Sequence, residues 1–209
     1  MQHLAILFFA TFSAAFMASA APGLLNVNAA KVSVEKGKIN GYIFGLGVST
    51  IVMVQALIAV FISKYLYNHP ETIDWLQKIA LFVFFFFAIY FFAKAKQGKV
   101  RPVKVAPIKK RKSFFKGMVL SALNMLAIPF FSGLNAMWNA TGWIHFKSGD
   151  ILAFVLAAGC GTFAIMYLYV VYFNKLETKT NRFSKNSNYI LSALMLVLLV
   201  ITIFRILYT

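Results

Sequence analysis

The chain has 209 residues, of which 61% are hydrophobic and 23 are phenylalanine, and its formal net charge is +16. A soluble protein of this length could hardly bury so much apolar surface, and the apolar runs do not alternate with polar residues as membrane-barrel strands do. The composition therefore predicts an all-α polytopic membrane protein. A hydrocarbon core of about 30 Å needs about 20 apolar residues per helix, and six stretches meet this length: Leu4–Ala21, Gly41–Ser63, Leu76–Ala93, Phe114–Trp138, Ile151–Phe173 and Tyr189–Tyr208.

The first span also has a feature of signal peptides, because Ala18-Ser19-Ala20 fits a cleavage site. The residues before it lack the positive charge that such peptides carry. Cleavage would also leave five spans and put a basic first loop on the wrong side of the membrane. We therefore expect the first span to be retained.

A helix break is predicted after this span, at Pro22-Gly23, because proline lacks an amide hydrogen and glycine relaxes the backbone. Residues Leu24–Lys36 then form a shorter helix, with Asn26 and Asn28 near its beginning. The free amides at its amino end can hold a carboxylate if the break is buried or lines a water-filled cavity. The alternative is a loop followed by an interfacial helix outside any transport pathway.

The second span combines glycines with one buried amide. Gly41 and Gly45 form a GxxxG pair, which indicates close helix contact. Gln55 lies deep in an apolar stretch and needs a hydrogen-bond partner there. Gln55 is either part of a polar pathway or bonded to another helix.

The third span is followed by a basic loop, Lys94 to Lys116, which contains ten Lys or Arg residues and no acid. Such a loop is expected to orient the protein and to contact anionic lipids, where each basic residue contributes about 1 kcal/mol. Because the loop separates two spans, topology explains its charge more simply than nucleic acid does, and no nucleic-acid partner is predicted.

The fourth span has small and polar residues on one helical face, at three- and four-residue intervals; these are Gly117, Ser121, Asn124, Ile128, Ser132 and Asn135. Pro129 removes a backbone hydrogen bond inside this span and should free the carbonyl of Met125. This combination marks a candidate binding site near the middle of the membrane. The alternative is ordinary helix packing through small residues.

Charge predicts the topology. The first, third and fifth loops hold most of the basic residues, so the positive-inside rule places them in the cytoplasm and both termini outside. Three spans precede the basic loop and three follow it, which is the arrangement of an inverted repeat. We therefore predict one transmembrane domain, 1–209, with a first half at 1–93, a cytoplasmic loop at 94–116 and a second half at 117–209.

No enzyme is predicted. The chain has a single cysteine, Cys160, and neither an H-E-x-x-H nor a G-x-S-x-G motif. We expect no catalytic residue, no metal site and no cofactor.

The segments Ala21–Val27, Glu35–Gly41 and Gly45–Gly47 resemble the amino-terminal signature of LysE-type translocators, which runs P-G-P, a glycine-basic pair and a glycine-rich second span. Residues 114–131 resemble the family segment F-x-x-G through L-N-P to F-F. The resemblance implies a bacterial inner-membrane exporter of amino acids or related small metabolites, driven by the proton gradient or membrane potential. Leu24 and Met125 replace family prolines, and Ser49 and Thr50 stand where many members carry an acid.

All five acids lie in or beside loops. The core therefore has no acid to carry a proton relay and no counter-ion for a cationic substrate. A zwitterionic amino acid is therefore the expected substrate, exported by alternating access between the two halves. The expected substrate-binding residues are Pro22, Gly23, Asn26, Asn28, Gln55, Asn124 and Pro129. A transport-inactive membrane scaffold or regulatory protein remains the alternative function, and a homo-oligomer is compatible with the sequence.

Overall fold

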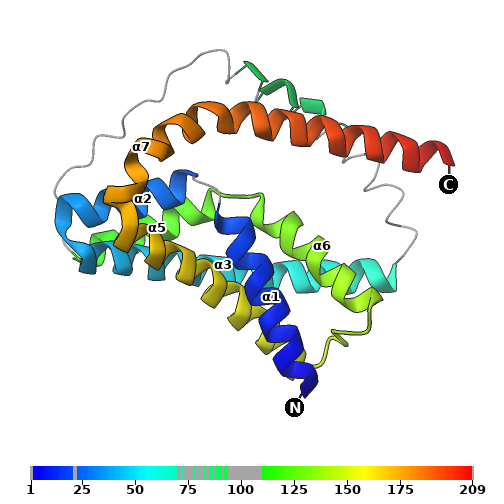
Figure 1. Ribbon diagram of the computed structural model, residues 1–209. Helices are drawn as coiled ribbons and strands as arrows, with labels where there is room; N and C mark the ends of the chain where they lie inside the picture. Colours follow the sequence, from blue (N-terminus) through cyan, green and yellow to red (C-terminus); the bar gives the residue numbers. More distant parts are fainter. Residues whose placement is uncertain are drawn as a thin grey trace. The chain divides into compact units, whose positions relative to one another are not determined.

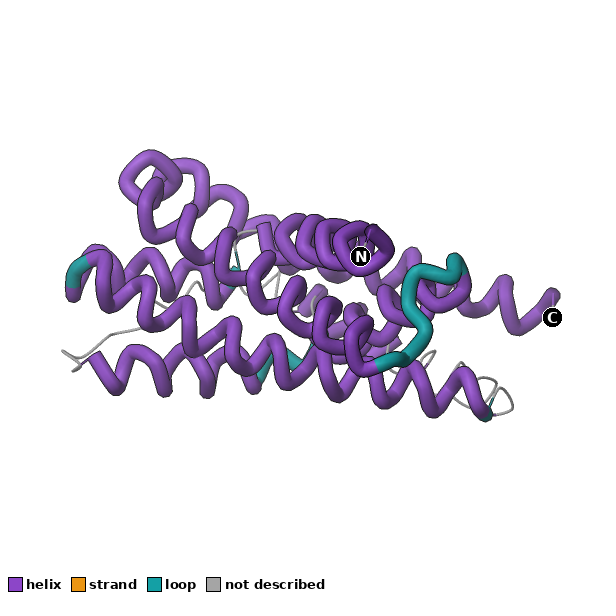
Figure 2. Tube along the Cα trace, turned by 90° about the horizontal axis from the view of Figure 1, so that it is seen from below, coloured by secondary structure: helices purple, strands orange, loops and turns teal. Residues whose placement is uncertain are grey.

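The computed structural model describes residues 2–20, 23–69 and 110–208, with scattered residues between 72 and 93, and most side chains after Tyr172 are not described (Figure 1). The described segments form helices and loops and contain no strand (Figure 2). The helices are α1 (Gln2–Ala20), α2 (Leu24–Lys36), α3 (Lys38–Asn68), α5 (Lys110–Ala122), α6 (Ala127–Ala140) and α7 (Ser148–Tyr208).

The chain divides into two compact units. The first unit comprises Met1–Tyr67 and Val105–Leu176, so it takes helices from both expected three-span halves. The second unit comprises Asn68–Lys104 and Glu177–Thr209 and includes the carboxyl-terminal part of α7. The side chains that bear on function belong to the first unit.

Four of the expected spans have counterparts among the described residues. Helices Gln2–Ala20, Lys38–Asn68 and Ser148–Tyr172 are each long and apolar enough to cross a membrane. The pair Lys112–Ala122 and Ala127–Ala140 passes the same test together, with a bend of 67° between its members. The expected third span, Leu76–Ala93, lies largely outside the described residues. The chain is therefore an all-α, multi-pass membrane protein.

The break after the first span is confirmed, because α1 ends at Ala20 and a separate helix, α2, has the predicted bounds Leu24–Lys36. The second break differs from the prediction. We expected one helix over the whole fourth span, with a backbone hydrogen bond lost at Pro129. Instead, one helix ends at Ala122 and another begins at Ala127. Pro129 is thus the third residue of α6, in the first turn, where an amide has no acceptor within the helix.

Two expected loops are wholly or partly helical. The backbone of α7 is helical from Ser148 to Tyr208, including the basic stretch after Phe173 that we predicted to be a loop. No glycine or proline follows Gly161, so no residue in this stretch favours a helix end. The last residues of the basic segment 94–116 also form helix, because α5 already begins at Lys110, and lysine and arginine are good helix formers.

The first unit has polar groups inside and apolar groups outside. Large side chains such as Phe9, Phe61 and Leu152 are exposed on α1, α3 and α7. Asn28, Gln55 and nine other uncharged polar residues are buried; the nine are Thr11, Asn26, Ser33, Ser49, Ser63, Ser113, Ser121, Asn135 and Thr162. Lipid can cover the apolar surface, whereas the buried polar groups must find partners inside the protein. This distribution agrees with a membrane environment.

Helices α3 and α5 approach each other so closely that a Cβ at Gly47 would collide with the backbone of Phe114, and one at Gly117 with the backbone of Phe44. Small residues permit such close contact between membrane helices. The predicted role of the GxxxG pair is also confirmed, because a Cβ at Gly41 would lie 2.8 Å from Val170 and one at Gly45 3.1 Å from Met166, both on α7.

Helix α3 runs parallel to the α5–α6 pair. Ser113 donates to Asn40, Ser121 to the carbonyl of Val48 and Ser132 to the carbonyl of Ala59, with a constant separation of 73 residues. The residue numbers of the contacting pairs increase together along both segments, so the two segments run in the same direction. The register is the same before and after the break, so α3 is a continuous support for a span that is itself interrupted.

Candidate functional site

Side chains close the junction between α1 and α2. The carbonyl of Gly23 accepts from the amide of Val27 at 3.0 Å and begins α2. The last carbonyls of α1 lack acceptor roles within their own helix, and two side chains satisfy them. Asn26 Nδ2 donates to the carbonyl of Ser19 at 2.7 Å, and the Tyr169 hydroxyl donates to the carbonyl of Ala20 at 3.0 Å.

Asn28, one turn into α2, is only partly satisfied. Its Nδ2 donates to the carbonyl of Leu24 at 2.8 Å. Its Oδ1 is buried and accepts no hydrogen bond from any described residue. Pro22, the other residue predicted at this junction, lies outside the described residues.

The break between α5 and α6 is held from α3 by Gln55. The Gln55 Nε2 donates to the carbonyl of Ser121 at 3.2 Å and to the carbonyl of Asn124 at 3.1 Å. Both carbonyls are at the place where α5 ends, and each also accepts a local backbone hydrogen bond, from the amide of Asn124 at 2.9 Å and from that of Ala127 at 3.4 Å. A single side-chain amide of α3 therefore joins both backbone acceptors of the break. Gln55 is 5% exposed, and its Oε1 has no hydrogen-bond partner in the described part of the chain.

Asn124 and Pro129 enter this site differently from the prediction. Asn124 contributes its backbone carbonyl to Gln55, while Asn124 itself is exposed. Pro129 lies in the first turn of α6, so it does not free the Met125 carbonyl from a continuous helix. The structure therefore groups the predicted residues in two places: Asn26 and Asn28 at the α1–α2 junction, and Gln55 and Asn124 at the α5–α6 break.

Asn135 was assigned to the polar face of the fourth span but was not proposed as a binding residue. It has no exposed surface, and neither its Oδ1 nor its Nδ2 has a hydrogen-bond partner among the described residues. One turn to either side, Ser132 bonds to α3 and the Trp138 Nε1 donates to Thr11 of α1 at 3.1 Å. Asn135 thus lies on the side of α6 that faces the other helices.

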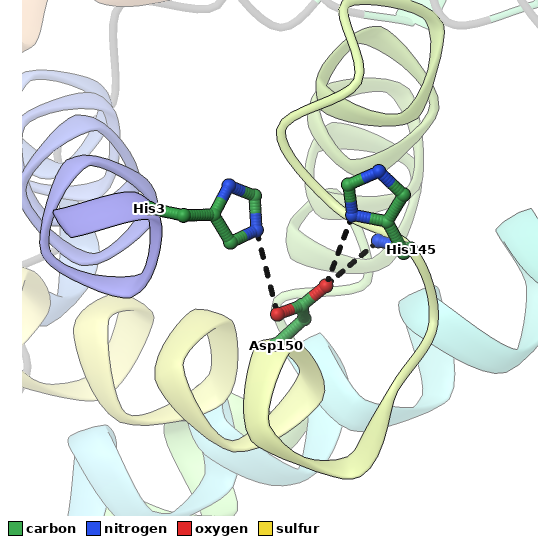
Figure 3. A group of neighbouring side chains, drawn as sticks. All are labelled: His3, His145 and Asp150. Carbon is green, nitrogen blue, oxygen red and sulfur yellow. Dashed lines mark hydrogen bonds and ion pairs between the residues drawn. The ribbon is translucent and has the colours of Figure 1, made fainter. Parts of the chain in front are cut away.

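A second group that the sequence did not reveal consists of His3, His145 and Asp150 (Figure 3). Potential metal-ligand atoms of the three residues lie within 4.8 Å of one another. The predicted topology could have indicated it, because an outside amino terminus and an outside fourth loop put all three residues at one membrane surface. The spacing in sequence, by contrast, resembles no metal motif.

Hydrogen bonds between uncharged groups predominate in the interior of the first unit. Among the described residues two charged groups are buried: the Asp150 side chain at the beginning of α7, and the Lys116 Nζ, which has no hydrogen-bond partner there. The broken helices bring carbonyls and side-chain amides into the bundle, and these groups can exchange partners without a change in protonation. The arrangement suits hydrogen bonding to polar groups inside the bundle.

A sequence profile of the LysE type translocator family matches residues 5–204, which is nearly the whole chain. Searches among curated proteins and among solved structures found no match. The matched range includes both helix breaks and the span candidates of the first unit, except for residues 2–4 of the first. The chain therefore belongs to the LysE type translocator family and is a membrane transport protein.

Proposed function

We propose that this protein is a secondary-active exporter of zwitterionic amino acids, or of closely related small metabolites, from the bacterial cytoplasm across the inner membrane. The observation that carries the proposal is the broken span α5–α6, in which Gln55 of another helix donates to two backbone carbonyls at the break. Irregular backbone at membrane depth is tolerated where it is buried in protein or lines an aqueous cavity. Discontinuous helices of this kind form substrate sites in many transporters.

Unpaired polar atoms support a binding role near this break. A buried polar atom without a partner costs about 1–3 kcal/mol, so a water molecule or a polar solute is expected to satisfy it. The Gln55 Oε1 and the Asn135 side chain are such atoms in the first unit, as is the Asn28 Oδ1 at the other junction. An ammonium group would use the oxygens, and a carboxylate would use an amide or the amino end of α2 or α6.

The scarcity of buried acids favours a substrate without net charge. A lysine-like solute brings a net positive charge into the bundle, and no acid is buried there apart from Asp150 at the beginning of α7, as far as the chain is described. Moving an unpaired charge into the membrane interior costs several kcal/mol. A zwitterion whose two charges are met by opposite helix ends and amides avoids this cost.

The proposed mechanism is alternating access around the two breaks, with cytoplasmic loops on one side and both termini outside. The element order supports an inverted repeat, because each half begins with a helix, a break, a second helix and then a long apolar helix, α3 or α7. The parallel direction of α3 and α5–α6 is the direction that the predicted topology requires of the second and fourth spans.

Contact with anionic lipid is proposed for the basic segment 94–116. A shallow hollow on α5 supports this, because its lining is apolar apart from two lysines; it consists of Lys112, Phe115, Lys116, Val119 and Leu120. Apolar side chains next to the ammonium group of the exposed Lys112 suit an acyl chain with a negatively charged headgroup, whereas the Lys116 Nζ is buried.

The test is amino-acid accumulation in cells that lack the protein. Cells loaded with dipeptides of neutral amino acids should retain more of the substrate amino acid inside when the gene is deleted. Wild-type protein should restore efflux, and the Gln55→Leu variant at equal membrane abundance should not. Purified protein in liposomes should then exchange the same amino acid.

The matched control is Thr50→Ala, on the same helix as Gln55. Thr50 is exposed, and its hydroxyl bonds to the carbonyl of Leu46 within α3. Efflux should survive this change. If deletion altered the internal level of no amino acid tested, the proposed function would be wrong, and the transport-inactive alternative would gain support.

A further inference from the structure

A cluster of two histidines and one aspartate joins three separate elements at one end of the first unit. His3 is at the beginning of α1, His145 is in the connection between α6 and α7, and Asp150 is in the first turn of α7 (Figure 3). The His3 Nε2 lies 3.5 Å from Asp150 Oδ1, and the His145 Nδ1 lies 3.6 Å from Asp150 Oδ2. No step of the proposed transport mechanism uses these side chains.

A structural role explains only part of the cluster. Asp150 accepts the backbone amide of His145 at 2.8 Å, and an acid in the first turn of a helix is stabilised by the free amides there. This accounts for the aspartate but for neither imidazole. The His3 Nε2 is a buried atom with no hydrogen-bond partner in the described part of the chain, although it is directed at the carboxylate.

The distances between the cluster atoms suit metal coordination better than direct hydrogen bonding. Nitrogen–oxygen hydrogen bonds are shorter, at about 2.7–3.2 Å. Two ligands that each lie about 2.0–2.1 Å from a tetrahedral zinc ion are about 3.3–3.4 Å apart. The two nitrogen–oxygen distances of 3.5 and 3.6 Å, to different oxygens of Asp150, are close to that value. One ligand atom from each residue lies within 4.8 Å of the others, so binding of an ion requires small side-chain rotations.

Burial and anchoring also favour an ion. The Asp150 side chain is 7% exposed, so its negative charge needs a compensating charge in the folded protein. The connection that carries His145 is held in place, because Ile144 is completely buried and its carbonyl accepts from Asn139 Nδ2 at 2.9 Å. The ligand atoms are therefore presented by anchored backbone rather than by a free loop.

We propose that His3, His145 and Asp150 bind a divalent transition metal of the zinc class. Imidazole nitrogens combined with one carboxylate suit Zn²⁺ and its neighbours, whereas Mg²⁺ and Ca²⁺ prefer ligand sets of oxygen alone. Three protein ligands leave a fourth position for water or an anion. The bound ion joins the start of α1, the α6–α7 connection and the start of α7.

The ion has a consequence for transport, and this consequence alone rests on the proposed function. Alternating access requires the helices around the breaks to move relative to one another. A metal that ties α1 to α7 resists this movement, so Zn²⁺ on the side of the termini should slow amino-acid exchange. The cluster is then an inhibitory site rather than a site for the transported solute.

The binding test uses full-length protein in lipid nanodiscs, purified through a tag without histidine and treated with a chelator. Titration with Zn²⁺ should show one saturable site per chain, and the thermal midpoint should rise with Zn²⁺ concentration. His3→Ala and His145→Ala should each weaken the affinity by at least about tenfold. Asp150→Asn should do the same while its side-chain oxygen still accepts the amide of His145, which keeps the fold intact.

His69→Ala is the matched control, because His69 directly follows α3, is exposed and does not belong to the cluster. It should bind Zn²⁺ like the wild type. Absence of a saturable site, or affinity that survives all three cluster substitutions, overturns the metal proposal. The metal proposal is also wrong if acid pH stabilises the protein and Zn²⁺ does not bind. In that case the protonated His3 and His145 pair with Asp150 without an ion.

Zn²⁺ added to liposomes that exchange an amino acid measures the inhibitory role. Exchange by the wild type should fall, and exchange by the His3→Ala/His145→Ala double variant should not. Equal inhibition of both proteins, or none, contradicts the inhibitory role. Failure of the transport proposal would instead appear as absent exchange in protein that still binds Zn²⁺.

Discussion

At both helix breaks of the first unit, backbone carbonyls accept hydrogen bonds from side chains, but the arrangement of donors differs. At the α1–α2 junction the break follows a complete span, and side chains of α2 and α7 pair with the last carbonyls of α1. At the α5–α6 break the interruption divides a single span with a bend of 67°, and one amide from α3 pairs with two carbonyls. At the junction two carbonyls each have a side-chain donor of their own, whereas at the break one side chain serves both carbonyls, beside the local backbone hydrogen bonds.

This difference separates a structural anchor from a candidate substrate site. Asn26 and Tyr169 each satisfy a carbonyl and hold α1 in place. Gln55 satisfies two carbonyls and still has an unpaired oxygen, and Asn135 further along α6 has no partner in the described residues. We therefore expect substitutions at the break to affect transport most and substitutions at the junction to affect stability most.

The largest effect is expected for Gln55→Leu. The change removes two hydrogen bonds, worth about 0.5–1.5 kcal/mol each, while the carbonyls of Ser121 and Asn124 keep their backbone donors, the amides of Asn124 and Ala127. We expect kcat/KM for amino-acid exchange in liposomes to fall at least about tenfold, the equivalent of about 1.4 kcal/mol. Transport by Gln55→Leu equal to that of Thr50→Ala would remove the break from the proposed site.

Asn135→Leu should separate binding from stability. Replacing a buried amide that lacks protein partners by an apolar side chain of similar size removes a desolvation cost, so the thermal midpoint should rise. Transport should fall severalfold if water or substrate uses that amide. Asn139→Leu on the same helix is the control, because Asn139 has a protein partner and its loss should lower the midpoint. A stabilised Asn135 variant with normal transport would assign Asn135 to packing alone.

Asn26→Asp tests the anchor. Aspartate has nearly the size of asparagine but donates no hydrogen bond, so the carbonyl of Ser19 loses its 2.7 Å partner. We expect a loss of roughly 1–3 kcal/mol in the free energy of unfolding and a KM close to the wild-type value. A raised KM without loss of stability would instead place Asn26 in the substrate site.

Tyr169→Phe should give a smaller loss at the same junction. It removes one hydroxyl whose bond to Ala20 is typical of a neutral pair, worth about 0.5–1.5 kcal/mol. Thermal unfolding of the purified protein measures the change. Combining it with Asn26→Asp in a double-mutant cycle should reveal coupling, because the two side chains serve neighbouring carbonyls.

The smallest effect is expected for Asn124→Ala. Since Asn124 meets Gln55 through its backbone carbonyl, alanine preserves that hydrogen bond. Transport should remain within about twofold of the wild-type rate, because exposed side chains away from such contacts contribute little. A tenfold loss would indicate that the exposed amide itself contacts the substrate.

Much of the fold could be predicted because its causes are local. Proline and glycine at positions 22 and 23 indicated a break, and the helix Leu24–Lys36 has the bounds that the sequence predicted. The polar face that ends at Asn135 was also visible as a helical spacing. The partner of Gln55 was not, because a hydrogen bond over 66 or 69 residues depends on how two helices align.

The sequence by itself determined that this chain is a helical membrane protein of the LysE type translocator family, since span length, apolar content and signature residues need no tertiary contact. Tertiary structure decided where the fourth span divides, which carbonyls Gln55 pairs with, and that His3 lies 3.5 Å from Asp150. Helical periodicity is a property of neighbouring residues, whereas these distances follow from the close approach of α3 to α5 at Gly47 and Gly117 and from the packing of α1 beside α7.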